Sequence, residues 1–239
     1  MRISIIVLTS SLILFLNAHI ANSNEIKSKT DDRGLYGFVT YGVAKHNAGV
    51  TSTASSGTIS ISSTDDDEGS MTTFGIGLKQ SEKLSFELYG GKIDGFGSST
   101  TVTATNAVIW GNTINGSLTL SEDISSDFYG VDSVFTNKIR FKEGAELTYF
   151  GKVGLVSYEI KDAITVSGSG TVNGVSYSGT EAITIKENGI APSLSAGVAF
   201  APTENLNLSI GISYINNVGG GDLVSADITA YNLGLSLGF

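Results

Sequence analysis

A two-residue period dominates this chain from Gly34 to its last residue. Apolar side chains occupy alternate positions, and glycine, serine, threonine and asparagine take most of the positions between them. Because successive side chains of a β-strand point to opposite faces, this alternation predicts strands with one apolar and one small polar face. The predicted strands cover eight segments: 34–45, 73–78, 84–89, 128–136, 146–155, 193–200, 206–213 and 231–239.

The residues on the non-apolar face help to decide between two all-β architectures. Alternation alone also fits a soluble β-sandwich, but its solvent face would be rich in Lys and Glu. Here that face consists of small residues with an occasional charge, which suits the narrow interior of a barrel. The chain also holds 30 glycines, too many to serve turns alone.

The connections between the predicted strands alternate in length. Short ones lie at Gln80–Lys83, 137–144 and 201–205, whereas long segments lie at about 46–70, 94–125 and 161–188, with a briefer one at 216–226. Short turns on one side and long loops on the other are typical of outer-membrane barrels. We therefore predict an all-β fold, an eight-stranded antiparallel transmembrane up-and-down β-barrel with long extracellular β-rich loops.

The long loops themselves contain β-forming residues. Segments 100–120 and 163–186 mix Val, Ile and Thr with Gly and Asn turn signals, as hairpins do. We expect these strands to continue beyond the bilayer as a projecting sheet, the alternative being disordered Ser/Thr/Gly loops. For the first loop, which contains the run GTISISS at 57–63, both interpretations stay open.

The N-terminus predicts export. Arg2 is the only charged residue before Glu25, and Ile3–Leu16 is an almost purely apolar run, shorter than the ~20 residues of a membrane-spanning helix. Small residues at Ala21 and Ser23 complete the pattern of a secretory signal. We expect a signal peptide at 1–23, a flexible segment at 24–33, a β-barrel domain at 34–239 and an outer-membrane location.

Composition excludes several function classes. The chain has no cysteine, which excludes a disulfide framework and a thiolate metal site. Its net charge of −9 argues against a nucleic-acid partner. After the signal, His46 is the only histidine, and no catalytic set can be assembled around it. We expect no catalytic residues, no cofactor and no metal, so the protein is not expected to be an enzyme.

The C-terminus carries the most specific motif. Asn232, Gly234, Leu237 and the terminal Phe239 match the pattern that outer-membrane barrels present to the barrel-assembly machinery. A last strand of this kind must pair with a partner edge while it keeps one lipid face. We predict that these four residues form the assembly signal.

With this motif, the runs LSFELYGGKID and GIAPSLSAGVAFAPTENLNLSIGISYI make the sequence resemble the small OmpA/OmpX-like outer-membrane barrel family over about residues 34–239. The resemblance implies location better than activity, because roles in that family range over envelope integrity, adhesion, resistance to host defences and passage of small solutes.

Three functions follow as hypotheses. The first is a structural or surface-interaction role through the outer loops, whose exposed edges can capture a partner by strand addition. The second is a narrow porin-like channel for small or apolar solutes, and the third is a lipid-modifying enzyme. The partners we expect are outer-membrane lipid and lipopolysaccharide, the assembly machinery and an extracellular molecule bound by the loops. We expect the barrel to be a monomer.

Charged residues on the predicted inner face form the next candidate site. Glu87, Asp132, Glu146 and Lys152 are expected to pair across the lumen, together with Lys79, Lys92 and Glu159. Since side chains nearly fill a barrel of this size, a structural plug of ion pairs is the first interpretation. A gated path for ions or solutes is the second.

Two loop features complete the candidates. The acidic run Asp65–Glu68 is interpreted as a solvated charge cluster, because it lacks the spaced ligands of a calcium loop. Trp110 lies among polar residues of the second long loop, where it is either a contact residue or the packing anchor of a hairpin. We favour the packing role.

Overall fold

The computed structural model describes residues 34–46, 53–141, 146–203, 205–219 and 226–238. These belong to the larger of two units, Arg33–Phe239. The expected signal peptide, the segment 24–33 and Phe239 lie outside the described residues. Within the described ranges, no helix is long and apolar enough to cross a membrane.

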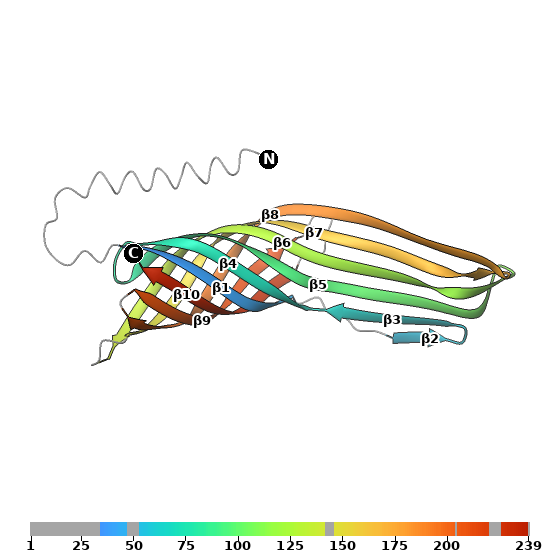
Figure 1. Cartoon of the computed structure of the whole chain (residues 1–239), viewed down its shortest axis with the longest axis horizontal. Helices are drawn as coiled ribbons and strands as arrows, with labels where there is room; N and C mark the ends of the chain where they lie inside the picture. The colour runs from blue at the N-terminus through green and yellow to red at the C-terminus, as the bar shows by residue number, and fades with distance from the viewer. Residues whose placement is uncertain (1–33, 47–52, 142–145, 204, 220–225, 239) are drawn as a thin grey trace, which may run out of the picture. The chain divides into compact units, whose positions relative to one another are not determined.

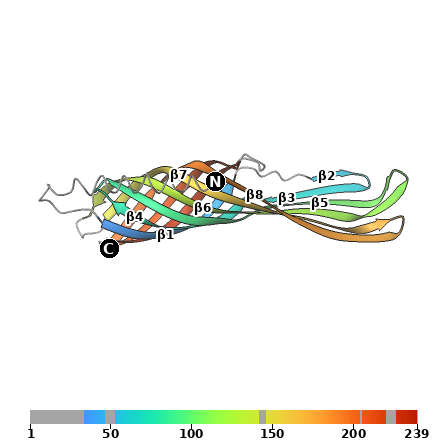
Figure 2. The same ribbon diagram turned by 90° about the horizontal axis from the view of Figure 1, so that it is seen from above.

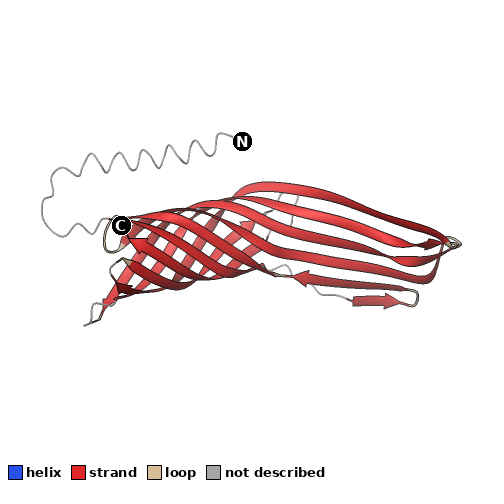
Figure 3. Cartoon of the chain, viewed as in Figure 1, coloured by secondary structure: helices blue, strands red, loops and turns tan. Residues whose placement is uncertain are grey.

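Eight antiparallel strands close into a ring, as predicted (Figures 1 and 3). β1 pairs with β10 and β5 pairs with β6, which joins the two ends of the sheet and leaves no free edge in the ring. A β-sandwich would keep separate sheets, so the closure excludes that alternative. The strands of the ring are β1 (Gly34–His46), β4 (Glu68–Lys79), β5 (Leu84–Ile109), β6 (Asn112–Arg140), β7 (Glu146–Val172), β8 (Val175–Thr203), β9 (Leu206–Val218) and β10 (Ala226–Gly238).

The outside of the ring is apolar. Phe74 is 62% exposed, Ile210 58% and Leu233 65%, and each alternates with a small inward-facing residue. A continuous outward band of large apolar side chains is what a lipid-facing barrel wall requires. The apolar face that the sequence pattern predicted is therefore the outer face of the barrel.

Glycines on the inner face accommodate aromatic rings. Tyr36 lies directly opposite Gly77, and Tyr89 lies directly opposite Gly130. In both pairs the ring occupies the space that a Cβ on the glycine would need. Because the interior of an eight-stranded barrel is narrow, a large side chain on one strand requires a very small one beside it. This pairing explains why glycine is required at positions 77 and 130.

A hydrophobic plug fills the barrel near the end opposite the short turns. Its largest fully buried side chains are Phe128, Ile93 and Val156. Further buried members come from strands around the ring and include Met71, Tyr158, Ile160, Ile215 and Ile228. The plug thus packs strands on opposite sides of the barrel against one another, and it excludes water from that part of the lumen.

The strands β5 to β8 are 26 to 29 residues long, against 12 or 13 for the other strands of the ring, and they extend beyond it as a projecting sheet (Figures 1 and 2). We use this name for residues 53–66, 97–125 and 161–190. β5 to β8 pair along their whole outer lengths, β3 (Ile59–Asp66) pairs with β5, and β2 (Thr53–Ser56) pairs with β3. The predicted projecting hairpins are therefore confirmed. The first loop, for which two interpretations were open, also forms a hairpin.

Two tight turns end the projecting sheet. Trp110 and Gly111 have φ of 49° and 82°, and Asn173 and Gly174 have φ of 51° and 82°. Positive φ at both central residues is typical of the type I′ turn, whose twist matches that of the flanking strands. The side chain of Asn173 bonds to the backbone N–H of Thr113, which joins the two hairpin ends.

Candidate functional site

The centre of the barrel wall carries a buried ion pair. Lys152 on β7 reaches past the intervening strand β6 to Glu87 on β5, with Nζ 2.5 Å from Oε2. The Tyr36 hydroxyl donates a hydrogen bond of 2.8 Å to the other carboxylate oxygen of Glu87. Only 5% of the Glu87 side chain is exposed. The rings of Phe38 and Phe150 lie 5.1 and 5.4 Å from the Lys152 ammonium and provide cation–π contacts.

Asp132 lies beside this pair, directly opposite Glu87 on the neighbouring strand β6. Its Oδ1 accepts hydrogen bonds from the hydroxyls of Tyr89, at 3.1 Å, and Ser193, at 3.2 Å. Gly154 faces it on β7, and a Cβ there would overlap the carboxylate. The structure therefore brings three of the four predicted lumen charges together, and hydroxyl donors and a glycine accommodate them.

A small cavity adjoins these charges. Its volume is about 70 Å³, and Thr40, Ser195, Ser209, Ser213 and Asn232 contribute to its lining. This is room for a few water molecules, since each needs about 10–15 Å³ by the same measure. It is far below the several hundred Å³ of a small-molecule site. The hydrophobic plug closes the lumen on the outward side of the charges.

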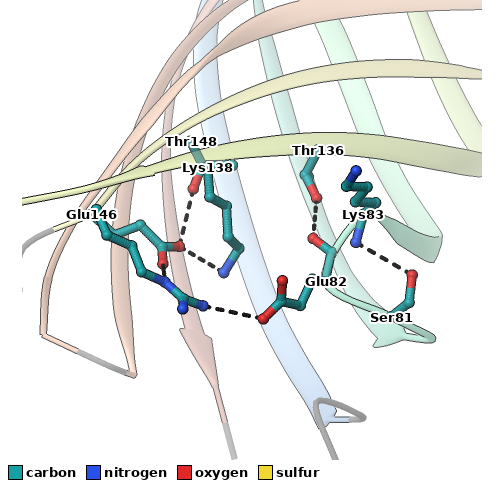
Figure 4. A network of polar contacts seen from close by, with 8 residues as sticks. Ser81, Glu82, Lys83, Thr136, Lys138, Glu146 and Thr148 are labelled. Carbon is teal, nitrogen blue, oxygen red and sulfur yellow. Dashed lines mark hydrogen bonds and ion pairs between the residues drawn. The ribbon is translucent and has the colours of Figure 1, made fainter.

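Glu146 lies away from this cluster, at the short-turn end of the barrel (Figure 4). Its carboxylate pairs with Lys138, at 2.6 Å, and with Arg140, at 3.3 Å. Arg140 also reaches Glu82 in the β4–β5 turn, at 3.2 Å. The predicted pairing of Glu146 with the other lumen charges is thus wrong, because nearer cations on the adjacent strand satisfy it.

Three further charges were expected in the lumen, and two of them face outward. Lys92 pairs with Asp94, and Glu159 pairs with Lys161 at 3.4 Å, both on the outer surface. Their neighbours along the strand point inward, so an error of one residue in the assumed alternation was enough to assign them to the wrong face. The alternation of apolar and polar residues is too weak in these segments to show which face each residue occupies. Lys79 does lie on the inner face, where β4 ends.

Three residues of the predicted assembly signal can be placed. Asn232 and Gly234 face the lumen, where the Asn232 amide donates to the Ser213 hydroxyl at 2.9 Å. Leu237 is on the outer face and half exposed. Phe239 lies outside the described residues. The geometry of the described three suits a closing strand with one packed and one lipid face.

The other two candidates from the sequence, His46 and the acidic run Asp65–Glu68, make local contacts. His46 packs edge-on against the Phe96 ring, with ring centroids 4.8 Å apart. Within the acidic run, Glu68 pairs with Lys45. Among the described residues, no group of three or more possible metal ligands was found.

The projecting sheet is the second candidate site, because its two faces differ sharply. Residues that continue the lumen-facing register are largely apolar, among them Val102, Leu118, Leu120, Ile164, Val166, Ile183 and Ile185. Residues that continue the lipid-facing register are almost all hydroxylated, among them Ser99, Thr101, Thr119, Ser121, Thr165, Ser167 and Thr180. The polarity of the wall therefore reverses beyond the barrel mouth. This reversal was not predicted, although alternating runs such as 118–121 contain it.

The apolar inner face of the projecting sheet is open. Leu118 is 51% exposed and Ile183 61%, because β1, β4, β9 and β10 end at the barrel mouth and provide no opposite wall. At the end of the sheet, Trp110 is 97% exposed. The packing role favoured for Trp110 is therefore wrong, since a type I′ turn directs this side chain into solvent.

Comparison with known proteins adds a likeness of fold. No family model and no curated protein matches the chain. Among solved structures, Neisserial surface protein A (NspA) is 13% identical with a TM-score of 0.47, covering 86% of this chain and 97% of that one. The N-terminal β-barrel domain of Pseudomonas aeruginosa OprF is 11% identical with a TM-score of 0.45, covering 86% and 98%. Ail, the attachment invasion locus protein of Yersinia pestis, is 13% identical with a TM-score of 0.38, covering 86% and 99%.

Proposed function

We propose that this chain is an integral outer-membrane protein of the OmpA/OmpX-like kind whose sealed barrel anchors a surface-displayed β-sheet. The observation that carries the proposal is the continuation of β5 to β8 beyond the barrel as a paired sheet with an open apolar face. Exposed apolar surface of this extent on a folded domain usually marks a contact site. The role is therefore structural or interactive, in envelope integrity or in adhesion.

The lumen supports an anchoring role better than transport. A solute would have to pass the Glu87–Lys152 pair and then the plug formed by Ile93, Phe128 and Val156. Breaking the ion pair would leave the buried Glu87 carboxylate unpaired. Opening the plug would separate packed apolar side chains. Both changes are costly, so the ion pairs act as structural elements in this proposal.

The edge of the projecting sheet offers one mode of contact. Residues 175–185 of β8 pair with β7 on one side, and the register between β8 and β9 begins only at Ser193. Their other side therefore carries no paired strand among the described residues. An extended segment of another protein can add to such an edge through backbone hydrogen bonds.

Assembly completes the proposal. The barrel-assembly machinery would recognise the last strand through Asn232, Gly234, Leu237 and Phe239. The inward amide of Asn232 and the outward side chain of Leu237 support this assignment. Outer-membrane lipid and lipopolysaccharide would contact the apolar band on the outside of the barrel.

Protease accessibility on intact cells tests the orientation. A cleavage site for a sequence-specific protease is inserted between Gly174 and Val175, at the end of the projecting sheet. The matched control carries the same insertion between Glu82 and Lys83, in a short turn at the opposite end. Hairpin ends tolerate insertions, so both chains should fold.

We expect added protease to cut the first chain on whole cells and the second only after lysis. Cutting of both chains on whole cells, or release of the intact protein into the medium, would refute the membrane-anchored display.

A further inference from the structure

The inner face of the projecting sheet lacks an opposing layer. The sheet continues only one side of the barrel wall, and the strands on the other side, β1, β4, β9 and β10, end at the barrel mouth. A sheet that is apolar on one face is normally covered by a second layer. Leu118, Tyr177 and Ile183 are instead each more than half exposed.

The size of this face suits a stable protein contact. Five strands, β3 and β5 to β8, form its width. At ~4.8 Å between strands and ~3.4 Å per residue over about twelve residues, the face covers ~1,000 Å². Two such faces packed together would bury ~2,000 Å² in total, above the ~1,600 Å² of a standard specific interface. Two sheets that pack through apolar faces are also a common protein architecture.

Charge on the projecting sheet is confined to its base. Near the barrel mouth the inner face carries Asp65, Glu122, Asp162 and Glu181. Farther out, residues 53–64, 99–121 and 163–180 contain no Asp, Glu, Lys, Arg or His. Two copies packed in parallel would bring acidic base against acidic base. Two copies packed antiparallel would place each acidic base opposite the uncharged end of the other, which removes the repulsion.

We propose that the inner face binds the inner face of a second copy anchored in an opposing membrane, so that two projecting sheets pack antiparallel between two cells. This inference rests on the proposed function and names the partner. Each sheet then fills the place of the wall that is missing above β1, β4, β9 and β10 of the other copy. The exposed ends with Trp110 and Tyr177 reach the barrel mouth of the partner.

Vesicle tethering tests this proposal. The full chain is purified from outer membranes and reconstituted into two populations of phosphatidylcholine vesicles with different dyes. Tethering is measured by fluorescence cross-correlation, with the protein in both populations or in only one. The outward-facing fraction is measured by cleavage at the Gly174–Val175 insertion.

We expect tethering only when both populations carry the protein. The variant Leu118→Asp/Ile183→Asp places charges on the inner face and should reduce tethering at least about tenfold, because buried unpaired charges are costly. The control Thr119→Asp/Thr184→Asp places the same charges on the hydroxylated outer face, one residue away, and should tether like the unmodified chain. Heat-dependent gel mobility of each variant verifies that its barrel is folded.

Cross-linking tests the antiparallel arrangement. Since the chain has no cysteine, single cysteines can be introduced by Ile114→Cys near the end of the sheet and Glu122→Cys near its base. A short bismaleimide should link Ile114→Cys chains to Glu122→Cys chains in the opposite vesicles, and neither variant to itself.

Three results would overturn the proposal. The first is tethering when only one vesicle population carries the protein, which would indicate lipid binding. The others are cross-links between two Ile114→Cys or two Glu122→Cys chains, and no tethering by chains whose projecting sheets are accessible to protease. The proposed function would survive that last result. It would fail separately if the inserted cleavage site were inaccessible from outside.

Discussion

Replacing Lys152 by methionine should destabilise the barrel strongly. Methionine keeps much of the apolar stem but removes the ammonium that lies 2.5 Å from Glu87. The Glu87 carboxylate is buried, and it would retain only the Tyr36 hydroxyl as a hydrogen-bond donor among its present contacts. Breaking one partner of a buried ion pair costs about 3–5 kcal/mol. Because Tyr36 remains, we expect the lower end, about 3 kcal/mol of unfolding free energy.

Urea unfolding in detergent micelles measures this loss of stability. The unfolding is followed by gel mobility and by far-ultraviolet circular dichroism, which reports backbone structure. The matched control is Lys161→Met, which breaks pairs with Asp127 and Glu159 on the outer surface. Those pairs are partly exposed to solvent, so the control should lose much less stability.

A double variant distinguishes the effect of an unpaired charge from the effect of a changed side-chain volume. In Glu87→Gln/Lys152→Met the remaining group is neutral, so most of the lost stability should return. If Lys152→Met unfolds at the urea concentration of the unmodified chain, or if the double variant is less stable than Lys152→Met, the ion pair does not stabilise the lumen.

Three other predictions follow from the same structure. Gly154→Ala should lower the unfolding free energy by about 2 kcal/mol in the same urea assay, because its Cβ would overlap Asp132, whereas Gly151→Ala, with nothing within 4 Å, should be nearly neutral. The unmodified chain should be electrically silent in a planar bilayer, and a steady conductance would contradict a sealed lumen. Asp162 is buried on the projecting sheet, and burial, followed by Glu122 and Asp123, raises its pKa. A raised folded-state pKa means that the ionised carboxylate opposes folding above that pKa, and the penalty disappears as the pH falls below the unfolded value. Asp162→Asn should therefore increase hydrogen-exchange protection of the sheet at neutral pH but not in acid, and equal protection at both would refute the assignment.

Much of the barrel could be predicted because its wall has strict local periodicity. In 206–213 and 231–238 apolar residues stand at every second position, which shows which side chains share one face of the strand. The positions of these strands could therefore be predicted from the order of residues. The partners and faces of the charged lumen residues were harder to predict from the sequence. Lys92 and Glu159 lie in segments where the alternation weakens, and there a shift of one residue moves a side chain from the lumen to the outer surface. Glu146 does face inward, but its partners depend on which cations of the adjacent strand lie within reach.

The order of residues was enough to predict that the chain forms strands, roughly where each lies, that glycine-rich faces turn inward, and that hairpins are favoured in the second and third long loops. These properties depend on neighbours along the chain. Three features could be read from the folded chain alone: Glu87, Asp132 and Lys152 meet while Glu146 does not, aromatic rings lie opposite glycines, and the apolar face of the projecting sheet is the inner one. Each of these depends on the register between strands distant in sequence, and that register is set by closure of the ring.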